Sequence, residues 1–142
     1  MIDCLANKIL EKILETVRSA QCFSLMSDET GLHGQEFLTV CLRYALVNGQ
    51  FKEDFFGFVQ VSDTTAENIA ASLLDRLKEL DINPKKMVGQ GYDGAAKMAG
   101  KLNGVQKRIR DIHPSADYFH CVSHNLNLAL SDASATADKP HH

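Results

Sequence analysis

The sequence has no long apolar run, no paired cysteine motif and no excess of basic charge. No stretch approaches the roughly 18 consecutive apolar residues of a membrane span. The N-terminal segment lacks the basic-then-apolar order of a secretory signal, so none is expected. The cysteines are scattered without a Cys-x-x-Cys pair, which argues against a zinc knuckle or a disulfide framework and favours a reducing compartment.

The balance of charge is slightly acidic, with a formal net charge of −3. Phosphate contacts dominate nucleic-acid affinity, so a free-standing nucleic-acid binder is usually basic. If this domain works on DNA, another region must therefore bring the DNA. The 142 residues, 44% hydrophobic and 23% charged, fit one globular domain with a single core.

Hydrophobic periodicity predicts one helix, a three-stranded meander and then alternating helices and strands. The first helix should run from Asp3 to about Ala20, with Asp3 as its N-cap. The other predicted elements are strands over 23–28, 36–46, 51–61, 86–91 and 118–122, a helix opened by a Thr64-x-x-Glu67 capping box, a helical stretch to about Ile112 broken at Asn103-Gly104, and a helix over 124–133. We expect residues 1–133 to fold and residues 134–142 to form a disordered polar tail.

This order of elements predicts an α/β fold. A meander followed by β-α-β crossovers gives a mixed five-stranded sheet, three antiparallel strands plus two parallel strands, flanked by helices. The layout resembles that of RNase H, in which the fourth strand returns by a right-handed crossover to lie parallel to the first. Asp28 ends the first predicted strand and Asp93 follows the fourth, so we expect these two carboxylates to be neighbours.

Paired carboxylates can hold one or two magnesium ions for phosphodiester chemistry. By itself, Asp28-Glu29 fits an ordinary strand exit better than a metal site. The segment Gly89-x-Gly91-x-x-Gly94 formally matches a dinucleotide fingerprint. We reject that interpretation because a meander precedes it, because the next strand lacks a ribose-binding acid, and because Asp93 would repel a pyrophosphate. The glycines instead should let the backbone turn sharply and present Asp93, although a plain tight turn is an equal alternative.

Further candidates lie after Asp93. Cys121-x-x-His124 is half of a zinc site without a second pair, and a buried cysteine with a helix-start histidine is the commoner explanation. Alternatively, His124 at a helix N-terminus faces a phosphate. The local basic excess is a solvated helix face by default, or a phosphate-contacting surface. Its members are Lys97, Lys101, Lys107, Arg108 and Arg110.

Five segments together resemble the transposase-like domain of the hAT superfamily. The resemblance is strongest to the group whose host-domesticated relatives often carry zinc fingers upstream. It covers about residues 9–130, in the right order. The segments are SLMSDET, CLRYALVNG, FVQVSDTTAENIAASLLDRL, GQGYDGAAKMAGKLNGVQKRI and YFHCVSHNLNLAL.

The resemblance implies an RNase H-like core that uses an Asp-Asp-Glu triad with Mg²⁺ or Mn²⁺ to nick and transfer DNA strands. Asp28 matches the first acid and Asp93 the second, while Cys121-x-x-His124 matches a signature near the active site and the DNA. The third acid would lie beyond a long helical insertion. The chain is therefore expected to be the N-terminal part of the core, truncated before the final helix and inactive alone. Lys97 stands where relatives often have Asn.

We thus expect a nuclear domain that meets DNA in the complete protein, with protein partners or self-association and no nucleotide cofactor. The main alternative is a domesticated, catalytically silent module for protein interaction or transcriptional regulation. A more distant alternative is a nucleotide-binding α/β enzyme.

Overall fold

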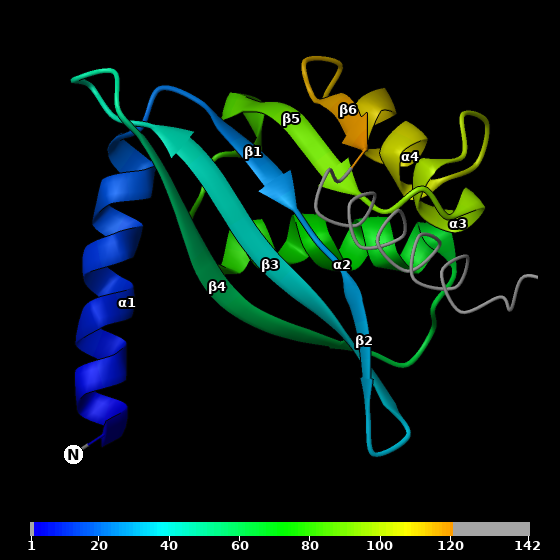
Figure 1. The fold of residues 1–142 in the computed structure, drawn as a ribbon, viewed down its shortest axis with the longest axis horizontal. Coiled ribbons are helices and arrows are strands. Elements are labelled where there is room, and N and C mark those ends of the chain that lie inside the picture. The colour runs from blue at the N-terminus through cyan, green and yellow to red at the C-terminus, as the bar shows by residue number, and fades with distance from the viewer. Residues whose placement is uncertain (1, 121–142) are drawn as a thin grey trace, which may run out of the picture.

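The computed structural model describes residues 2–120, which form one mixed sheet with helices packed against it (Figure 1). The elements in chain order are α1 (Ile2–Ser19), β1 (Phe23–Met26), β2 (Glu29–Leu32), β3 (Gln35–Ala45), β4 (Phe51–Val61), α2 (Ala66–Glu79), the 3-10 turn η1 (Pro84–Lys86), β5 (Met87–Tyr92), α3 (Ala96–Ala99), α4 (Val105–Ile112) and β6 (Asp117–His120). The predicted helix over 124–133 and the tail lie outside the described residues.

The sheet has the strand order β2-β3-β1-β5-β6, and β4 also pairs with β3. β3 runs antiparallel to β1, β2 and β4, whereas β5 runs parallel to both β1 and β6. The antiparallel part precedes the parallel part in the chain, and α2 makes the crossover between them. The predicted α/β class, with a meander followed by two parallel strands, is confirmed.

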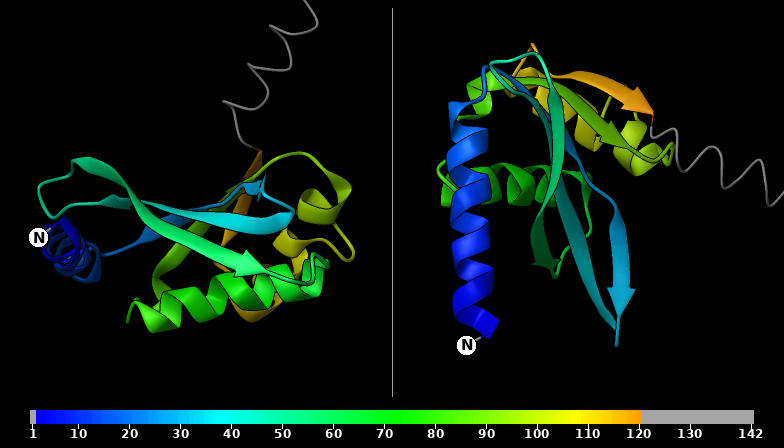
Figure 2. Two further views of the ribbon diagram at one scale, coloured as in Figure 1. Left: turned by 90° about the horizontal axis from the view of Figure 1, so that it is seen from below. Right: turned by 60° about the vertical axis from the view of Figure 1, so that its left-hand side comes forward.

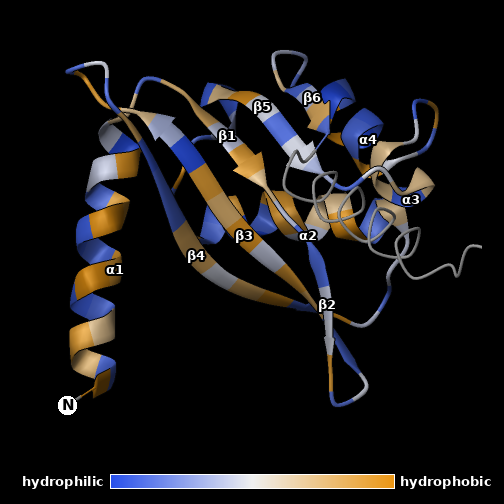
Figure 3. Ribbon diagram, in the orientation of Figure 1, coloured by the Kyte–Doolittle hydropathy of each residue, from blue (hydrophilic) through white to orange (hydrophobic). Residues whose placement is uncertain are grey.

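The first strand of the meander is longer than predicted. Met26 pairs with Cys41 and Glu29 pairs with Leu38. The two pairs are three positions apart on both strands, so the register is continuous from β1 into β2. β2 was not among the predicted strands, so the sheet has six strands instead of the predicted five. His33 and Gly34 both have positive φ, 51° and 75°, which closes a tight hairpin. β2 is mostly hydrophilic in Figure 3, which is why periodicity missed it.

One face of the sheet carries the hydrophobic core. Along β3 the buried residues alternate with half-buried or exposed ones, as expected for a strand with one covered face. α2 and α4 lie on the same side of the sheet, as the two views of Figure 2 show. Their buried residues are Ile69, Ala70, Leu73, Leu77, Val105, Gln106 and Ile109.

The opposite face carries exposed aromatic residues and is uncovered by any helix of the described part of the chain. Phe55 and Phe58 on β4 are 50% and 57% exposed. Their rings meet edge to face at 5.0 Å between centroids, and Phe37 on β3 adds a third ring at 6.3 Å from Phe58. The two faces therefore differ sharply in burial, and the side chains of Asp28 and Asp93 project toward the uncovered one.

Two predicted helix starts were wrong by one residue or more. α1 begins at Ile2, so Asp3 lies inside the first turn instead of at the N-cap. The N-cap of α2 is Thr65, whose hydroxyl accepts the amide of Asn68 at 3.3 Å. Asp63 accepts the amide of Thr65 at 2.9 Å, which places Thr65 at the cap and leaves the predicted Thr64 box unused.

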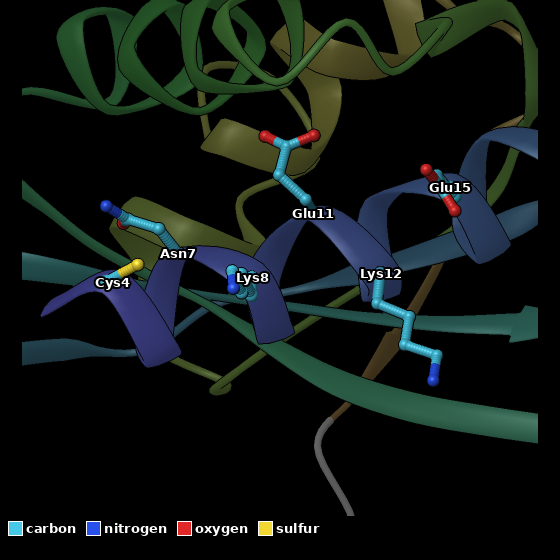
Figure 4. A pocket seen from close by; sticks show the side chains of 6 residues that line it. All are labelled: Cys4, Asn7, Lys8, Glu11, Lys12 and Glu15. Atoms are coloured by element: carbon cyan, nitrogen blue, oxygen red, sulfur yellow. The ribbon is translucent and has the colours of Figure 1, made fainter. Parts of the chain in front are cut away.

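α1 lies at the end of the sheet opposite to α3 (Figures 1 and 2). Only its C-terminal half joins the core, through Leu14 and Val17. A hollow along its N-terminal half is lined by lysines and glutamates in similar number, with no arrangement suited to chemistry (Figure 4). Neither α1 nor any other described helix combines the length and apolar character that crossing a membrane requires.

A buried amide fixes β5 to the helical layer. The Gln90 side-chain amide donates to the carbonyls of Gln106 and Ala116, both at 2.9 Å. Gln106 in turn donates to the carbonyls of Ala99 at 3.2 Å and Gly100 at 3.4 Å. These bonds hold the turn between α3 and α4 against the end of β5, where Asp93 follows.

Candidate metal site

Asp28 and Asp93 follow two neighbouring parallel strands at the same edge of the sheet. Met26 pairs with Gly91, and the amide of Ser27 donates to the Gly91 carbonyl at 3.2 Å. Asp28 and Asp93 each lie two positions further on, so the pleat directs both side chains toward the uncovered face. Neighbouring strands lie about 4.8 Å apart. The juxtaposition expected from the sequence is therefore present in the backbone.

Asp28 is held by its backbone and leaves its carboxylate available. Its amide donates to the Thr39 hydroxyl at 2.9 Å, and its carbonyl accepts the Thr39 amide at 2.9 Å. The side chain is exposed. Within residues 2–120 the Asp28 carboxylate has neither a hydrogen-bond partner nor a cationic partner, so it can accept a ligand without breaking a contact.

The side chain of Asp93 stabilises the turn in which Asp93 itself lies. Its Oδ1 accepts the amide of Ala95 at 3.2 Å, and its carbonyl accepts the hydroxyl of Tyr118 at 3.1 Å. One carboxylate oxygen is thus used to fix the turn. The second oxygen has no partner in the described part of the chain.

The absence of a side chain at Gly94 leaves space for the ring of His120, a residue that was not predicted from the sequence. A Cβ at Gly94 would lie 2.7 Å from Nε2 of His120, so the histidine ring occupies the place of a side chain. His120 is the last described residue of β6 and is exposed. Its position immediately before Cys121-x-x-His124 was the only signal in the sequence.

The basic residues have different surroundings. Lys97 donates to Glu29 at 2.9 Å and ties α3 to β2. Glu29 pairs with the buried Leu38 and so points to the face opposite to Asp28. Lys101 is exposed in the turn between α3 and α4. The other two predicted contacts, Cys121 and His124, lie outside the described residues.

The donor set suits a hard divalent cation but is incomplete in the described residues. Carboxylate oxygens are the ligands that Mg²⁺ and Mn²⁺ prefer. Among residues 2–120 no three His, Cys, Asp or Glu side chains gather closely enough to hold a metal. Asp28 and Asp93 can therefore supply part of a metal site, and a third ligand must come from elsewhere.

The titrating groups beside the sheet do not suggest nucleophilic catalysis. Burial, and then the negative charge of Glu53, raises the pKa of the Cys41 thiol, so it stays protonated at neutral pH. Burial and then Lys85 lower the pKa of His113, which lies at the end of α4 remote from Asp28 along the chain.

Tyr92, just before Asp93, carries a buried hydroxyl without a hydrogen-bond partner in the described structure. Burial, and to a smaller extent electrostatic interaction with Tyr118, raises the pKa of Tyr92 far above its usual 10.0. Below that pH the phenol is neutral in both the folded and the unfolded chain. Above it the unfolded chain ionises while the folded chain does not, so the free energy of unfolding falls as pH rises.

We expect Tyr92→Phe to raise the free energy of unfolding by about 1 kcal/mol at neutral pH, because an unsatisfied buried hydroxyl is removed. The loss of stability above pH 10 should also become shallower. Urea unfolding followed by circular dichroism on both sides of that pH measures both effects. A less stable variant at neutral pH would show that the hydroxyl has a partner.

Comparison with known proteins decides the family. Residues 1–104 match the model of the family described as ZMYM1/FAM200, RNase-like domain (DUF4371). The chain belongs to this family. The predicted kinship with transposase-derived RNase-like domains is therefore confirmed.

Two relatives and two solved structures are also similar. The "52 kDa repressor of the inhibitor of the protein kinase" of Homo sapiens and that of Mus musculus are each 28% identical over 133 residues. The match covers 92% of this chain but only 17% of each repressor, so the chain spans about a sixth of these relatives.

The HTLV-2 integrase catalytic core domain in complex with magnesium has a TM-score of 0.41 at 9% identity, covering 85% of this chain and 76% of that one. A Bacteroides thetaiotaomicron protein with an actin-like ATPase fold has a TM-score of 0.41 at 13% identity, covering 81% and 38%. Both likenesses are too distant to bear on function.

Proposed function

We propose that this RNase-like domain is the N-terminal part of a hAT-type, metal-dependent DNA strand-transfer core that acts in the nucleus. The observation that supports it most is the placement of Asp28 and Asp93 at one edge of two adjacent parallel strands, both facing the uncovered side. When bound between such carboxylates, divalent ions stabilise the attacking and leaving oxygens of a phosphodiester. The described residues hold two of the acids that this chemistry requires, so residues 2–120 alone should not cut DNA.

The residues around the two acids contribute positioning. Thr39 fixes the backbone of Asp28 from the neighbouring strand, and Tyr118 fixes the backbone of Asp93. The bond from Ala95 to Asp93 preorganises one carboxylate before any ligand arrives.

The alternative is a silent descendant that serves protein interaction or transcriptional regulation. The exposed aromatic residues of the uncovered face favour it, because such surfaces often contact proteins. The name of the human relative, a repressor, is compatible with it. Cation binding at Asp28 and Asp93 separates the two proposals.

We expect Mg²⁺ to bind the chain weakly, with a dissociation constant on the order of 1 mM, since only part of a ligand set is present. Amide shifts in NMR spectra should concentrate at Asp28, Asp93 and Ala95, and Mn²⁺ should broaden the same signals. Asp93→Asn should abolish the response while keeping the turn, because an Asn oxygen can still accept the Ala95 amide.

The matched control is Asp75→Asn, an exposed acid on α2. It should leave the Mg²⁺ response unchanged. If neither Asp28 nor Asp93 responds to Mg²⁺ or Mn²⁺, the strand-transfer proposal fails and the silent module is favoured.

A further inference from the structure

Basic charge is segregated in one stretch of an otherwise acidic chain. Residues 94–110 contain five Lys or Arg and no Asp or Glu, whereas the rest of the chain has ten basic and 18 acidic residues. Lys97 lies on α3, and the other four cations lie on α4 or in the turn before it. A chain with net charge −3 therefore still has a local anion-attracting surface.

The structure gathers three of these cations along an open groove of about 530 Å³ between α4 and β6. Lys101 comes from the turn, Lys107 and Arg110 from α4, and Phe119 from β6. Asp117 is the single acid among the lining residues. The groove thus combines cations with an aromatic ring on a concave surface.

The existing ion pairs of the groove are readily exchanged for phosphate. Arg110 meets Asp117 at 3.1 Å with side chains 52% and 61% exposed, and Lys107 meets Asp111 on the same helix. Exposed pairs of this kind contribute little to stability. Lys101 has no ion-pair partner among residues 2–120.

Phe119 provides a platform for a base. It is 60% exposed and, because it pairs with Gly91, its ring lies on the same face as Asp28 and Asp93. α4 lies on the other face, so a DNA strand that contacts both the α4 cations and this ring must cross the β6 edge of the sheet. A Cβ at Gly89 would lie 3.2 Å from the Phe119 ring, so the missing side chain lets the ring lie over β5. Stacking on an exposed aromatic ring requires an unpaired base, which a duplex does not offer.

We propose that this groove binds one strand of single-stranded DNA, with phosphates on Lys101, Lys107 and Arg110 and a base stacked on Phe119. The choice of DNA rests on the proposed function, whereas the preference for a single strand rests on the groove itself. Phe119 lies on β6, next to β5, and Asp93 follows β5. A DNA strand stacked on Phe119 would therefore lead toward Asp93.

The test is fluorescence anisotropy of a labelled oligothymidine of about 12 nucleotides with the 142-residue chain at low salt. EDTA is present throughout, so the result is independent of metal binding at Asp28 and Asp93. Three phosphate contacts predict a slope of about −2 for the logarithm of the association constant against that of salt. Lys101→Ala and Arg110→Ala should each make the slope shallower by about 0.7.

Phe119→Leu keeps an apolar side chain without a ring and should weaken binding about tenfold, whereas Phe119→Tyr should bind within about twofold of the parent. Lys52→Ala, an exposed cation on β4, is the control and should have no effect. Thermal unfolding verifies that each variant is folded. Equal affinity for a duplex of the same length, unchanged affinity of Phe119→Leu, or no binding at low salt would each overturn the proposal.

The two proposals fail separately. Binding of single-stranded DNA in EDTA, without a Mg²⁺ response, would overturn the metal-site proposal and support the groove proposal. A Mg²⁺ response at Asp93 without binding of single-stranded DNA would support the metal-site proposal and overturn the groove proposal.

Discussion

Replacing Phe56 by alanine should lower the free energy of unfolding by about 3–5 kcal/mol, the usual result for a fully buried aromatic residue. Phe56 is 1% exposed on the face of β4 that α2 covers. The Arg76 guanidinium of α2 donates to the Phe56 carbonyl at 3.2 Å, so β4 and α2 are joined at this point. Loss of the ring would leave a cavity beneath α2. Urea unfolding followed by circular dichroism measures the resulting loss in the free energy of unfolding.

Phe58 is the matched control, two residues further along the same strand. It is 57% exposed and its ring contacts Phe55 and Phe37. Phe58→Ala should therefore cost only about 1 kcal/mol, the typical contribution of aromatic pairs at a surface. Similar losses for the two variants would contradict the one-sided sheet, and with it the exposed setting of Asp28 and Asp93.

The topology was predictable because it follows from the order of elements and from strong rules of connection. The short link between the predicted strands over 36–46 and 51–61, followed by a predicted helix, defines a meander and then a crossover. Right-handed crossovers then leave few places for β5. Once β5 lies parallel to β1, Asp28 and Asp93 must be neighbours, and this conclusion requires no knowledge of side-chain contacts.

Features that depend on local partners were not predictable. The N-cap of α2 is set by the bond between Asp63 and Thr65, which competes with an equally plausible cap at Thr64. β2 has no hydrophobic alternation because three of its four residues are exposed, and only its pairing with β3 reveals it. The contact between Lys97 and Glu29 joins residues 68 positions apart and leaves no signal in the sequence.

The glycines of the Gly89-x-Gly91-x-x-Gly94 segment were explained wrongly. They were expected to let the backbone turn sharply, yet Gly89 and Gly91 lie inside β5 and none of the three has positive φ. Close packing explains them better. A Cβ would meet the Ser24 hydroxyl at Gly89 and the His120 ring at Gly94. A sequence pattern shows that a side chain is missing, but only the tertiary structure shows what occupies its place.

Gly89→Ala should therefore destabilise the fold by about 1–3 kcal/mol, the usual cost of overpacking. Its Cβ would lie 2.5 Å from Oγ and 3.2 Å from Cβ of Ser24 on β1. The two strands are hydrogen-bonded there, with Ser24 and Gly89 directly paired, so neither backbone can move aside easily. Urea unfolding of the parent and the variant measures the difference.

Gly91→Ala provides the control in the same strand. Its Cβ would lie 3.4 Å from Cγ of Met26, a flexible side chain that can yield. We expect a change within about 0.5 kcal/mol, because the lower entropy of the unfolded alanine chain offsets slight crowding. Adding Ser24→Ala to Gly89→Ala removes the closest atom and should restore part of the loss, a coupling that a double-mutant cycle detects. Because the crowding arises between β1 and β5, additive effects of the two substitutions would contradict the direct pairing that also brings Asp28 beside Asp93.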